Sequence, residues 1–365
     1  MVAVFPRRRP PRSDAFPIAD RIRRSMDAYE VRETDPDYEG VTRTERDRPT
    51  PADDEVLIRL RAASLNYRDL AIANSELAYP GASLPVVPLS DGAGDVVEVG
   101  AAVERLAEGD RVATPFAPNW VDGPGTDEKL ATSTGGNVDG ALTQYATFPA
   151  ESVPRLPDHL SYEEGATLSC AGLTAWRALV EDGGLSADET VLALGTGGVS
   201  TFALQFAEMH GARSVVTSSS DEKLDRAREL GAWETINYEE TPDWHETVME
   251  RTDGEGVDHV VEVGGQGTLE RSLGAAGING HVHLIGVLTG QQGEIDPSPV
   301  LGKAVTLEGV FGVGSRAMFD RMNRALDTTG TTPVVDRVFE FDAAREAYRY
   351  LESGDHQGKV VVDIE

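Results

Sequence analysis

The chain has 365 residues, and its 62 acidic against 33 basic residues give a formal net charge of -29. Such an acidic surface repels nucleic acid and anionic membranes, and a hydrophobic content of 40% argues against intrinsic disorder. The single cysteine, Cys170, excludes an internal disulfide and a multi-cysteine zinc site. No apolar run approaches the roughly eighteen residues that a transmembrane helix needs. We therefore expect a folded, cytoplasmic enzyme, and the acidic excess is typical of halophilic microbes, whose salt screens the repulsion.

The first 25 residues differ from the rest of the chain, since they carry seven arginines and two acidic residues. No apolar stretch follows them, so the segment is not a secretory signal. Two interpretations stay open: a disordered basic arm, or an upstream start codon assigned in place of a natural start at Met26.

Short strand-like segments dominate residues 26–157. They alternate with turns rich in glycine, proline and aspartate, which is typical of a compact, barrel-like β domain. A short helix is expected to begin within residues 66–70, and residues 115–140 have the composition of a long exposed lobe. The expected strands are residues 55–63, 92–100, 109–113 and 145–148.

From residue 158 to about 313, strands alternate with helices, which predicts a doubly wound parallel sheet with right-handed crossovers. Ser161 and Glu164 form a capping box at the first helix of this region. After two helices at 317–326 and 343–351, a closing strand at 359–364 is expected to return to the β-rich domain. The expected parallel strands are residues 191–194, 214–217, 259–263 and 281–285, with helices at 222–230 and 267–273 between them.

A glycine-rich turn follows the apolar segment 190–194 and precedes a helical apolar pattern. Strand, turn and helix together are the context that a dinucleotide-binding site requires. Gly195 allows the tight turn, and Gly197 lets the backbone approach a pyrophosphate at the helix N-terminus. Ser200 stands where the third glycine of the fingerprint is expected, and its small side chain still permits close packing of the helix on the strand.

These segments together resemble a zinc-independent branch of the medium-chain dehydrogenase/reductase superfamily, near the quinone oxidoreductases and the zinc-type alcohol dehydrogenase-like proteins. The resemblance covers residues 26–365. It implies an α/β protein with a GroES-like β-rich catalytic domain, residues 26–157 and 314–365, interrupted by a Rossmann domain, residues 158–313. It also implies an active site in the cleft between them and a homodimer paired through the Rossmann domains. The matching blocks are residues 64–70, 91–94, 109–112, 165–179 and the Gly195 turn.

The zinc ligands of this superfamily are largely missing. Zinc-dependent relatives place a cysteine where Asn66 stands and a His-Glu pair where Ser90 and Asp91 stand. Only Cys170 matches a third ligand position, whereas a catalytic zinc usually takes three protein ligands. The lobe at 115–140 also lacks the four cysteines that those relatives carry. We therefore predict no metal, and we expect Cys170 to be a buried, inert side chain.

Three residues favour NADP(H) over NAD(H). An NAD-binding enzyme carries an acid after the second strand of the parallel sheet, where Ser219 stands in this chain. Lys223 and Tyr238 lie at the spacing that NADPH-dependent quinone oxidoreductases use to bind the 2′-phosphate. Asp221 and Glu222 count against a phosphate, and the alternative for Lys223 is a solvated helix face.

Without zinc, no Lewis acid polarises a simple ketone, so a quinone or an enone is the more suitable hydride acceptor. Asn66 and Tyr67 are the expected hydrogen-bond donors to the oxygen that gains charge. Two alternatives stay open: a zinc-independent alcohol dehydrogenase, and a non-catalytic protein that binds NADPH. The resemblance implies further cofactor contacts, with Thr174 beside the nicotinamide and Lys359 at the pyrophosphate, and the others are Gly198, Val199, Ser218, Gly264, Ile285, Gly286 and Val313.

Overall fold

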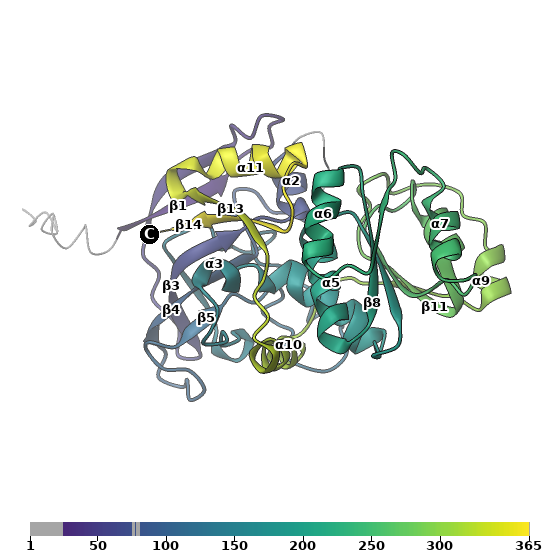
Figure 1. Cartoon of the computed structure of the whole chain (residues 1–365). Helices are drawn as coiled ribbons and strands as arrows, with labels where there is room; N and C mark the ends of the chain where they lie inside the picture. Colours follow the sequence, from purple (N-terminus) through teal and green to yellow (C-terminus); the bar gives the residue numbers. More distant parts are fainter. Residues whose placement is uncertain (1–24, 75–76, 78–80, 365) are drawn as a thin grey trace, which may run out of the picture.

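The structure is a computed structural model that describes residues 25–74, 77 and 81–364. The predicted basic extension lies outside these residues, apart from Ser25, where strand β1 begins. Figure 1 shows two regions side by side: a β-rich region that holds both ends of the described chain, and a region built on a parallel sheet. The fold is therefore α/β, with the two kinds of sheet that the sequence predicts.

The parallel sheet has six strands in the order β12-β11-β10-β7-β8-β9, and every neighbouring pair is parallel. Its central strands β7 and β10 have no exposed position, as burial on both faces requires. The order reverses between these two strands, and ligands of such sheets bind outside the carboxyl ends of the strands at this point. The strands are β7 (Thr190–Leu194), β8 (Arg213–Ser218), β9 (Glu234–Asn237), β10 (Val257–Glu262), β11 (Ala276–Leu284) and β12 (Thr306–Gly309).

Helices cover both faces of this sheet. On one face α5 and α6 share a core with Val191 and Ala193, and on the other α7 and α8 pack with Leu192 and Val260. The predicted strands at β7, β8, β10 and β11 are confirmed, whereas β9, β12 and α7 were not predicted, and the two strands have only four residues each. The helices are α5 (Gly198–His210), α6 (Asp221–Glu229), α7 (Trp244–Arg251), α8 (Leu269–Ala275) and α9 (Ser298–Lys303).

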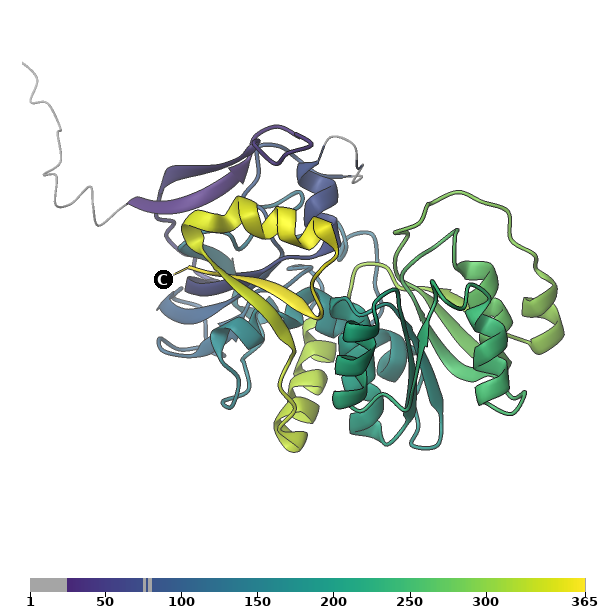
Figure 2. The same ribbon diagram turned by 45° about the horizontal axis from the view of Figure 1, so that its top comes forward.

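The second sheet joins strands from the N-terminal half of the chain to two C-terminal strands. Its order is β13-β14-β3-β4-β5, and β6 pairs with β3. Because β14 is antiparallel to β3, the C-terminal segment lies in the β-rich region, as Figure 2 shows. The strands are β3 (Glu55–Ser64), β4 (Asp91–Val99), β5 (Arg111–Ala113), β6 (Tyr145–Pro149), β13 (Val335–Glu340) and β14 (Lys359–Asp363), beside the hairpin β1 (Ser25–Val31) and β2 (Val41–Asp47). The helices are α2 (Tyr67–Ala73), α10 (Arg316–Thr329) and α11 (Ala344–Ser353), with 3-10 turns η1 (Ala150–Ser152) and η4 (Phe341–Ala343).

One hydrophobic core crosses between the two sheets. Ala62 of β3 and Val361 of β14 belong to the same cluster as Ala193 of β7 and Phe202 of α5. A helical segment at this junction alternates between α and π hydrogen bonding, and π-type turns occur often at functional sites. Its parts are α3 (Tyr162–Gly165), the π-helix η2 (Leu168–Gly172), α4 (Leu173–Trp176) and the π-helix η3 (Arg177–Asp182). Among the described residues, no helix is both long and apolar enough to cross a bilayer.

Candidate functional site

The glycine turn joins β7 to α5 at the point where the strand order reverses. Gly195 has a φ of 73°, in the left-handed region that favours glycine, and its N–H donates to Thr217 Oγ1 over 3.2 Å. Gly197 is the extended N-cap of α5. Ser200 Oγ donates to the carbonyl of Leu194 over 2.6 Å, which ties the helix back to the strand. The serine at the third fingerprint position therefore has a structural role. The N–H groups in the first turn of a helix have no acceptor within the helix, so the start of α5 suits an anion.

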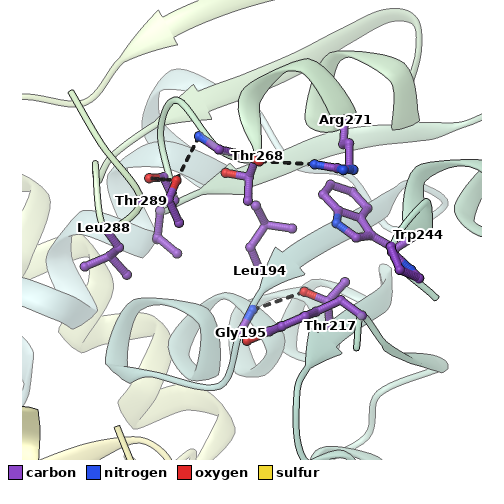
Figure 3. A pocket seen from close by; sticks show the side chains of 13 residues that line it. Leu194, Gly195, Thr217, Trp244, Thr268, Arg271, Leu288 and Thr289 are labelled. Atoms are coloured by element: carbon purple, nitrogen blue, oxygen red, sulfur yellow. Dashed lines mark hydrogen bonds between the residues drawn. The ribbon is translucent and has the colours of Figure 1, made fainter. Parts of the chain in front are cut away.

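A pocket of about 370 Å³ lies beside this turn, at the carboxyl ends of β7, β8 and β10. It brings together three predicted cofactor residues, Gly195, Tyr238 and Gly264. Trp244 of α7 and Arg271 of α8 also line it, and Figure 3 shows both on the wall away from Leu288. Its volume and mixed lining suit part of a dinucleotide. No sequence motif marks Trp244 or Arg271, because each is one polar or aromatic residue on an otherwise ordinary helix.

A buried carboxylate shapes the loop after β10. Glu262 is fully buried, and its Oε1 accepts from the N–H groups of Gly264 and Gly265, at 2.7 and 2.9 Å, and from Thr268 Oγ1 at 2.6 Å. Ser272 Oγ donates to the other oxygen. These bonds fix the loop at the pocket wall. A glutamate that ends a buried apolar strand is the signal that could have identified this residue from the sequence.

The predicted phosphate-binding residues lie at an open edge of the pocket region. Ser218 is buried and accepts Tyr238 N–H through its carbonyl, whereas Ser219 is exposed. Lys223 Nζ donates to the carbonyl of Gly354, which leaves two of its three donors for other partners. The residues therefore surround the end of β8, but the pocket itself includes only Tyr238 of this set.

His356 lies beside the same turn. An added Cβ at Gly197 would be 4.0 Å from its Nε2. Burial, and then the charge of Lys223, lower the pKa of His356 to about 4. The ring is therefore neutral at pH 7 and adds no positive charge to this end of the site.

A second group of polar side chains lies between the two sheets, and we call it the junction cluster: Asn66, Asp69, Ser90, Asp91 and Lys359. Lys359 is 3% exposed, and its Nζ donates to the carbonyl of Leu65 and to Asn66 Oδ1, each over 2.6 Å. Its Nζ also lies 3.5 Å from Asp91 Oδ2, and Asp91 is fully buried. The ammonium thus binds groups of the β-rich half, and the pyrophosphate contact that the resemblance implies stays a prediction.

The backbone explains the direction of this lysine. Gly358 N–H donates to the carbonyl of Thr196 over 2.9 Å, so β14 begins against the glycine turn. The Lys359 side chain then crosses the start of α5, where an added Cβ at Gly198 would lie 2.6 Å from its Cδ. The stem therefore passes the turn, and the ammonium reaches the junction cluster beyond it.

Asn66 caps α2 and belongs to this cluster. Its N–H donates to Asp69 Oδ2 over 2.7 Å, and burial raises the pKa of Asp69 to about 6. Asn66 Nδ2 is buried and has no hydrogen-bond partner among the described residues. Tyr67, the second predicted donor, is 45% exposed on the first turn of α2. Arg68 instead binds the 115–140 lobe, through the carbonyl of Thr134.

These donors do not fit a zinc ion. Ser90 Oγ donates to Asp91 Oδ1 over 2.7 Å, and the ammonium of Lys359 faces the other oxygen of Asp91. Burial, and then the charge of Asp91, raise the pKa of the Cys170 thiol well above its ordinary value, so the thiolate that zinc prefers is disfavoured. Within residues 25–74, 77 and 81–364, no group of three histidine, cysteine or acidic side chains could hold a metal.

Four more predicted residues lie on segments around the junction. Thr174 is buried in α4, between the two π-type turns. Ile285 and Gly286 follow β11, and their N–H groups donate to the carbonyl of Glu262 over 2.8 and 3.2 Å. Val313 has a φ of 65°, a strained conformation for a β-branched residue. Such strain often marks a backbone group held for a ligand.

Comparison with known proteins gives the same assignment for both halves. Residues 52–158 match the alcohol dehydrogenase GroES-like domain, and residues 198–328 match the zinc-binding dehydrogenase family. The chain is 44% identical over 317 residues to a zinc-type alcohol dehydrogenase-like protein of Schizosaccharomyces pombe, which covers 85% of this chain and 91% of that protein.

Two further proteins are similar to most of this chain. An NADPH-dependent alkenal/one oxidoreductase of Arabidopsis thaliana is 30% identical over 324 residues, 86% of this chain and 73% of that protein. A solved structure assigned as an alcohol dehydrogenase, from Sinorhizobium meliloti, has a TM-score of 0.87 and 39% identity, and the match covers 93% of this chain and 99% of that one.

Proposed function

Because the chain belongs to the medium-chain dehydrogenase/reductase superfamily and is an oxidoreductase, we propose that it reduces a conjugated carbonyl compound, an enone or a quinone, with NADPH and without zinc. The observation that carries this proposal is the ammonium of Lys359 bound to Asn66 Oδ1 and facing Asp91. A cation at this place repels a metal ion, so the substrate oxygen depends on hydrogen-bond donors. A conjugated acceptor suits such a site, because the hydride adds at a carbon remote from the oxygen.

The cofactor would bind at the carboxyl edge of the parallel sheet. NADPH supplies a hydride when it is bound. The glycine turn and the start of α5 would hold the pyrophosphate, and the pocket with Tyr238 and Arg271 would hold the adenosine. Residues 158–313 would thus form the cofactor domain, and residues 26–157 with 314–365 the catalytic domain.

The donors would act on the other side of the cleft. Asn66 Nδ2 lacks a partner in the described structure, and the Tyr67 hydroxyl is on an exposed side chain. Both would donate to the oxygen that becomes an enolate or hydroquinone oxygen, and Tyr67 or water would protonate it. The strained backbone at Val313 would hold the carboxamide of the nicotinamide, beside the buried Thr174.

The proposed choice of NADPH rests on Ser219, Lys223 and Tyr238. The exposed Ser219 leaves the end of β8 without the acid that binds a ribose 2′-hydroxyl, and Lys223 keeps two free donors. Lys223→Ala should weaken NADPH about 10- to 100-fold and NADH far less, since a charged hydrogen bond contributes about 1.5–3 kcal/mol. Titration by nicotinamide fluorescence measures both affinities, and an equal loss for the two cofactors refutes the phosphate assignment.

An acceptor panel tests the reaction itself. Stopped-flow oxidation of bound NADPH is followed with quinones, enones and saturated ketones. We expect rapid oxidation with enones or quinones only. Turnover with ketones alone would favour a zinc-independent alcohol dehydrogenase, and tight NADPH binding without any oxidation would favour a non-catalytic protein.

The proposed homodimer uses the edge strand β12. Leu301, Leu307 and Phe311 are exposed on this strand and its flanks, at 87%, 37% and 75%. Pairing of β12 with β12 of a second copy would cover this apolar edge, which would otherwise favour aggregation. Phe311→Asp should shift the protein from dimer to monomer in analytical ultracentrifugation, and a wild-type monomer would contradict the assembly.

The acidic excess supports a halophilic origin. With 62 acidic against 33 basic residues, self-repulsion destabilises the compact state at low salt. Thermal unfolding should therefore shift to higher temperature between 0.2 and about 2 M KCl, and a flat response would contradict this origin.

A further inference from the structure

The bond between Lys359 and Asn66 determines which way a carboxamide faces. A lysine ammonium only donates hydrogen bonds, so the Asn66 atom 2.6 Å from it must be the oxygen. The amide nitrogen Nδ2 is then turned away from the lysine. It is buried and has no partner among the described residues. A buried N–H group without an acceptor costs about 1–3 kcal/mol, which indicates that an acceptor arrives from outside the chain.

The lysine is itself held from several sides. The carbonyl of Leu65 accepts a second bond from Nζ, and Asp91 supplies a buried counter-charge that Ser90 Oγ orients. The stem is confined by the start of α5, since an added Cβ at Gly198 would lie within 2.6 Å of it. These contacts fix the position of the ammonium. Its hydrogen bond to Oδ1 then fixes the orientation of the Asn66 carboxamide.

We propose that Lys359 is a positioning residue: it fixes Asn66 Oδ1 so that the Nδ2 hydrogens are presented to the carbonyl oxygen of the substrate. The assignment rests on the proposed function, since it is the reduction of a carbonyl compound that supplies this acceptor. A donor fixed before the reaction stabilises developing charge without reorganising during the step. The stem of the same lysine passes the glycine turn at Gly198, so this one side chain contacts both the proposed cofactor-binding turn and the proposed donor Asn66.

A double-variant cycle tests this role. Asn66→Leu removes the donor, and kcat for an enone should fall about 100- to 1000-fold. Lys359→Met keeps the length of the stem and removes the ammonium, and kcat should fall about 10-fold or more. The double variant should match Asn66→Leu alone, because Lys359 acts through Asn66. KM for the enone and the Kd for NADPH, measured by fluorescence, should change less than about threefold in Lys359→Met.

Lys303→Met is the matched control. Lys303 Nζ also donates to two carbonyls, those of Gly274 and Ala276, but it lies on α9, which packs against β11 and α8 away from the junction cluster. Its kcat should equal that of the wild type. If Lys359→Met does not fold, Lys359→Arg keeps the charge beside Asp91 and changes the reach, and it should show a smaller fall in kcat at an unchanged Kd for NADPH.

Three results would overturn the assignment: an unchanged kcat in Lys359→Met, a double variant whose losses multiply, or a Kd for NADPH raised tenfold at constant kcat. The last would assign Lys359 to the pyrophosphate. If the wild type reduces no acceptor, the proposed function fails separately. Crystal structures then decide the positioning role, since an Asn66 side chain in the same place in Lys359→Met would exclude it.

Discussion

The pocket and the junction cluster lie on the two sides of one glycine turn, and they hold their charges differently. At the pocket, Tyr238 is 37% exposed and Lys223 binds a single carbonyl. In the junction cluster, Lys359 and Asp91 are 3% and 0% exposed and face each other. Water screens the first group, whereas each member of the second depends on its partner. Substitutions at the pocket should therefore change affinity, and those at the junction should also change the free energy of unfolding.

The largest effect is expected from Asp91→Ala. It leaves the Lys359 ammonium buried without a carboxylate, so the free energy of unfolding should fall by about 3–5 kcal/mol in urea titrations at pH 7.5. Glu98→Ala is the control on the same strand. Glu98 pairs with Arg48 at 2.6 Å, the two side chains are 43% and 29% exposed, and the loss should be about 1 kcal/mol or less. Equal losses for the two variants would remove the distinction between the buried and open ion pairs.

The next effect depends on pH. Burial raises the pKa of Asp69 to about 6, above its ordinary value of 3.8, so the folded chain binds this proton more tightly than the unfolded chain. Stability is therefore lost as the pH rises from about 4 to 6 and stays lost above it. Asp69→Asn lacks this titration, so its stability relative to the wild type should improve by up to about 3 kcal/mol between pH 4 and 7.

Asp110 provides a control of opposite sign for that experiment. Burial raises the pKa of Asp110, but hydrogen bonds from Arg155 and the Ala107 N–H outweigh burial and leave this pKa below its ordinary value. The wild type therefore gains stability over Asp110→Asn as the pH rises toward 3.8, and the difference should stay constant between pH 5 and 7, where Asp69→Asn still changes. If the Asp69→Asn curve ran parallel to that of the wild type at every pH, Asp69 would titrate normally and the junction would be better hydrated than its geometry indicates.

A smaller effect on stability is expected at the pocket end. Lys223→Ala removes one bond to the carbonyl of Gly354 at the surface, so the free energy of unfolding should fall by only about 0.5–1 kcal/mol. Urea titration of the protein without cofactor measures it. A loss comparable to that of Asp91→Ala would mean that the pocket end is as dependent on its charges as the junction.

The smallest signal is expected from Cys170. Cys170 is partly exposed, which differs from the predicted buried side chain. Because desolvation still raises the pKa of its thiol, alkylation of the native protein at pH 8 should be at least about 100-fold slower than that of the unfolded chain. Mass spectrometry after timed addition of iodoacetamide measures the two rates. Rapid native labelling would show that the junction opens to water.

The sequence predicts the local features of this molecule better than the contacts between distant segments. The apolar segment at β7, the turn at Gly195 and the capping box at Ser161 each depend on neighbours within a few residues, and all three are confirmed. Four-residue strands such as β9 are too short for their apolar pattern to stand out. Their positions are fixed by the strands beside them.

The candidate site shows the same limit. Asn66 and Lys359 can each be singled out from the sequence, but their contact joins positions 293 apart. It exists because β14 returns to β3 and passes the glycine turn on the way. Trp244 and Arg271 became site residues only when the helices after β9 and β10 were placed around one pocket. Hydrophobic periodicity and turn residues do not predict such contacts between segments that are distant in the sequence.

The direction of Lys359 also limits what protein engineering can do with this scaffold. Replacing Asn66, Ser90 and Asp91 with the ligands of zinc-dependent relatives would place the new donor atoms beside an ammonium that now lies 2.6 Å from Asn66 Oδ1 and 3.5 Å from Asp91 Oδ2. Such a graft should bind zinc poorly until position 359 is also made neutral. Under the proposed function, a residue of the last strand would thus decide between metal and hydrogen-bond chemistry at this site.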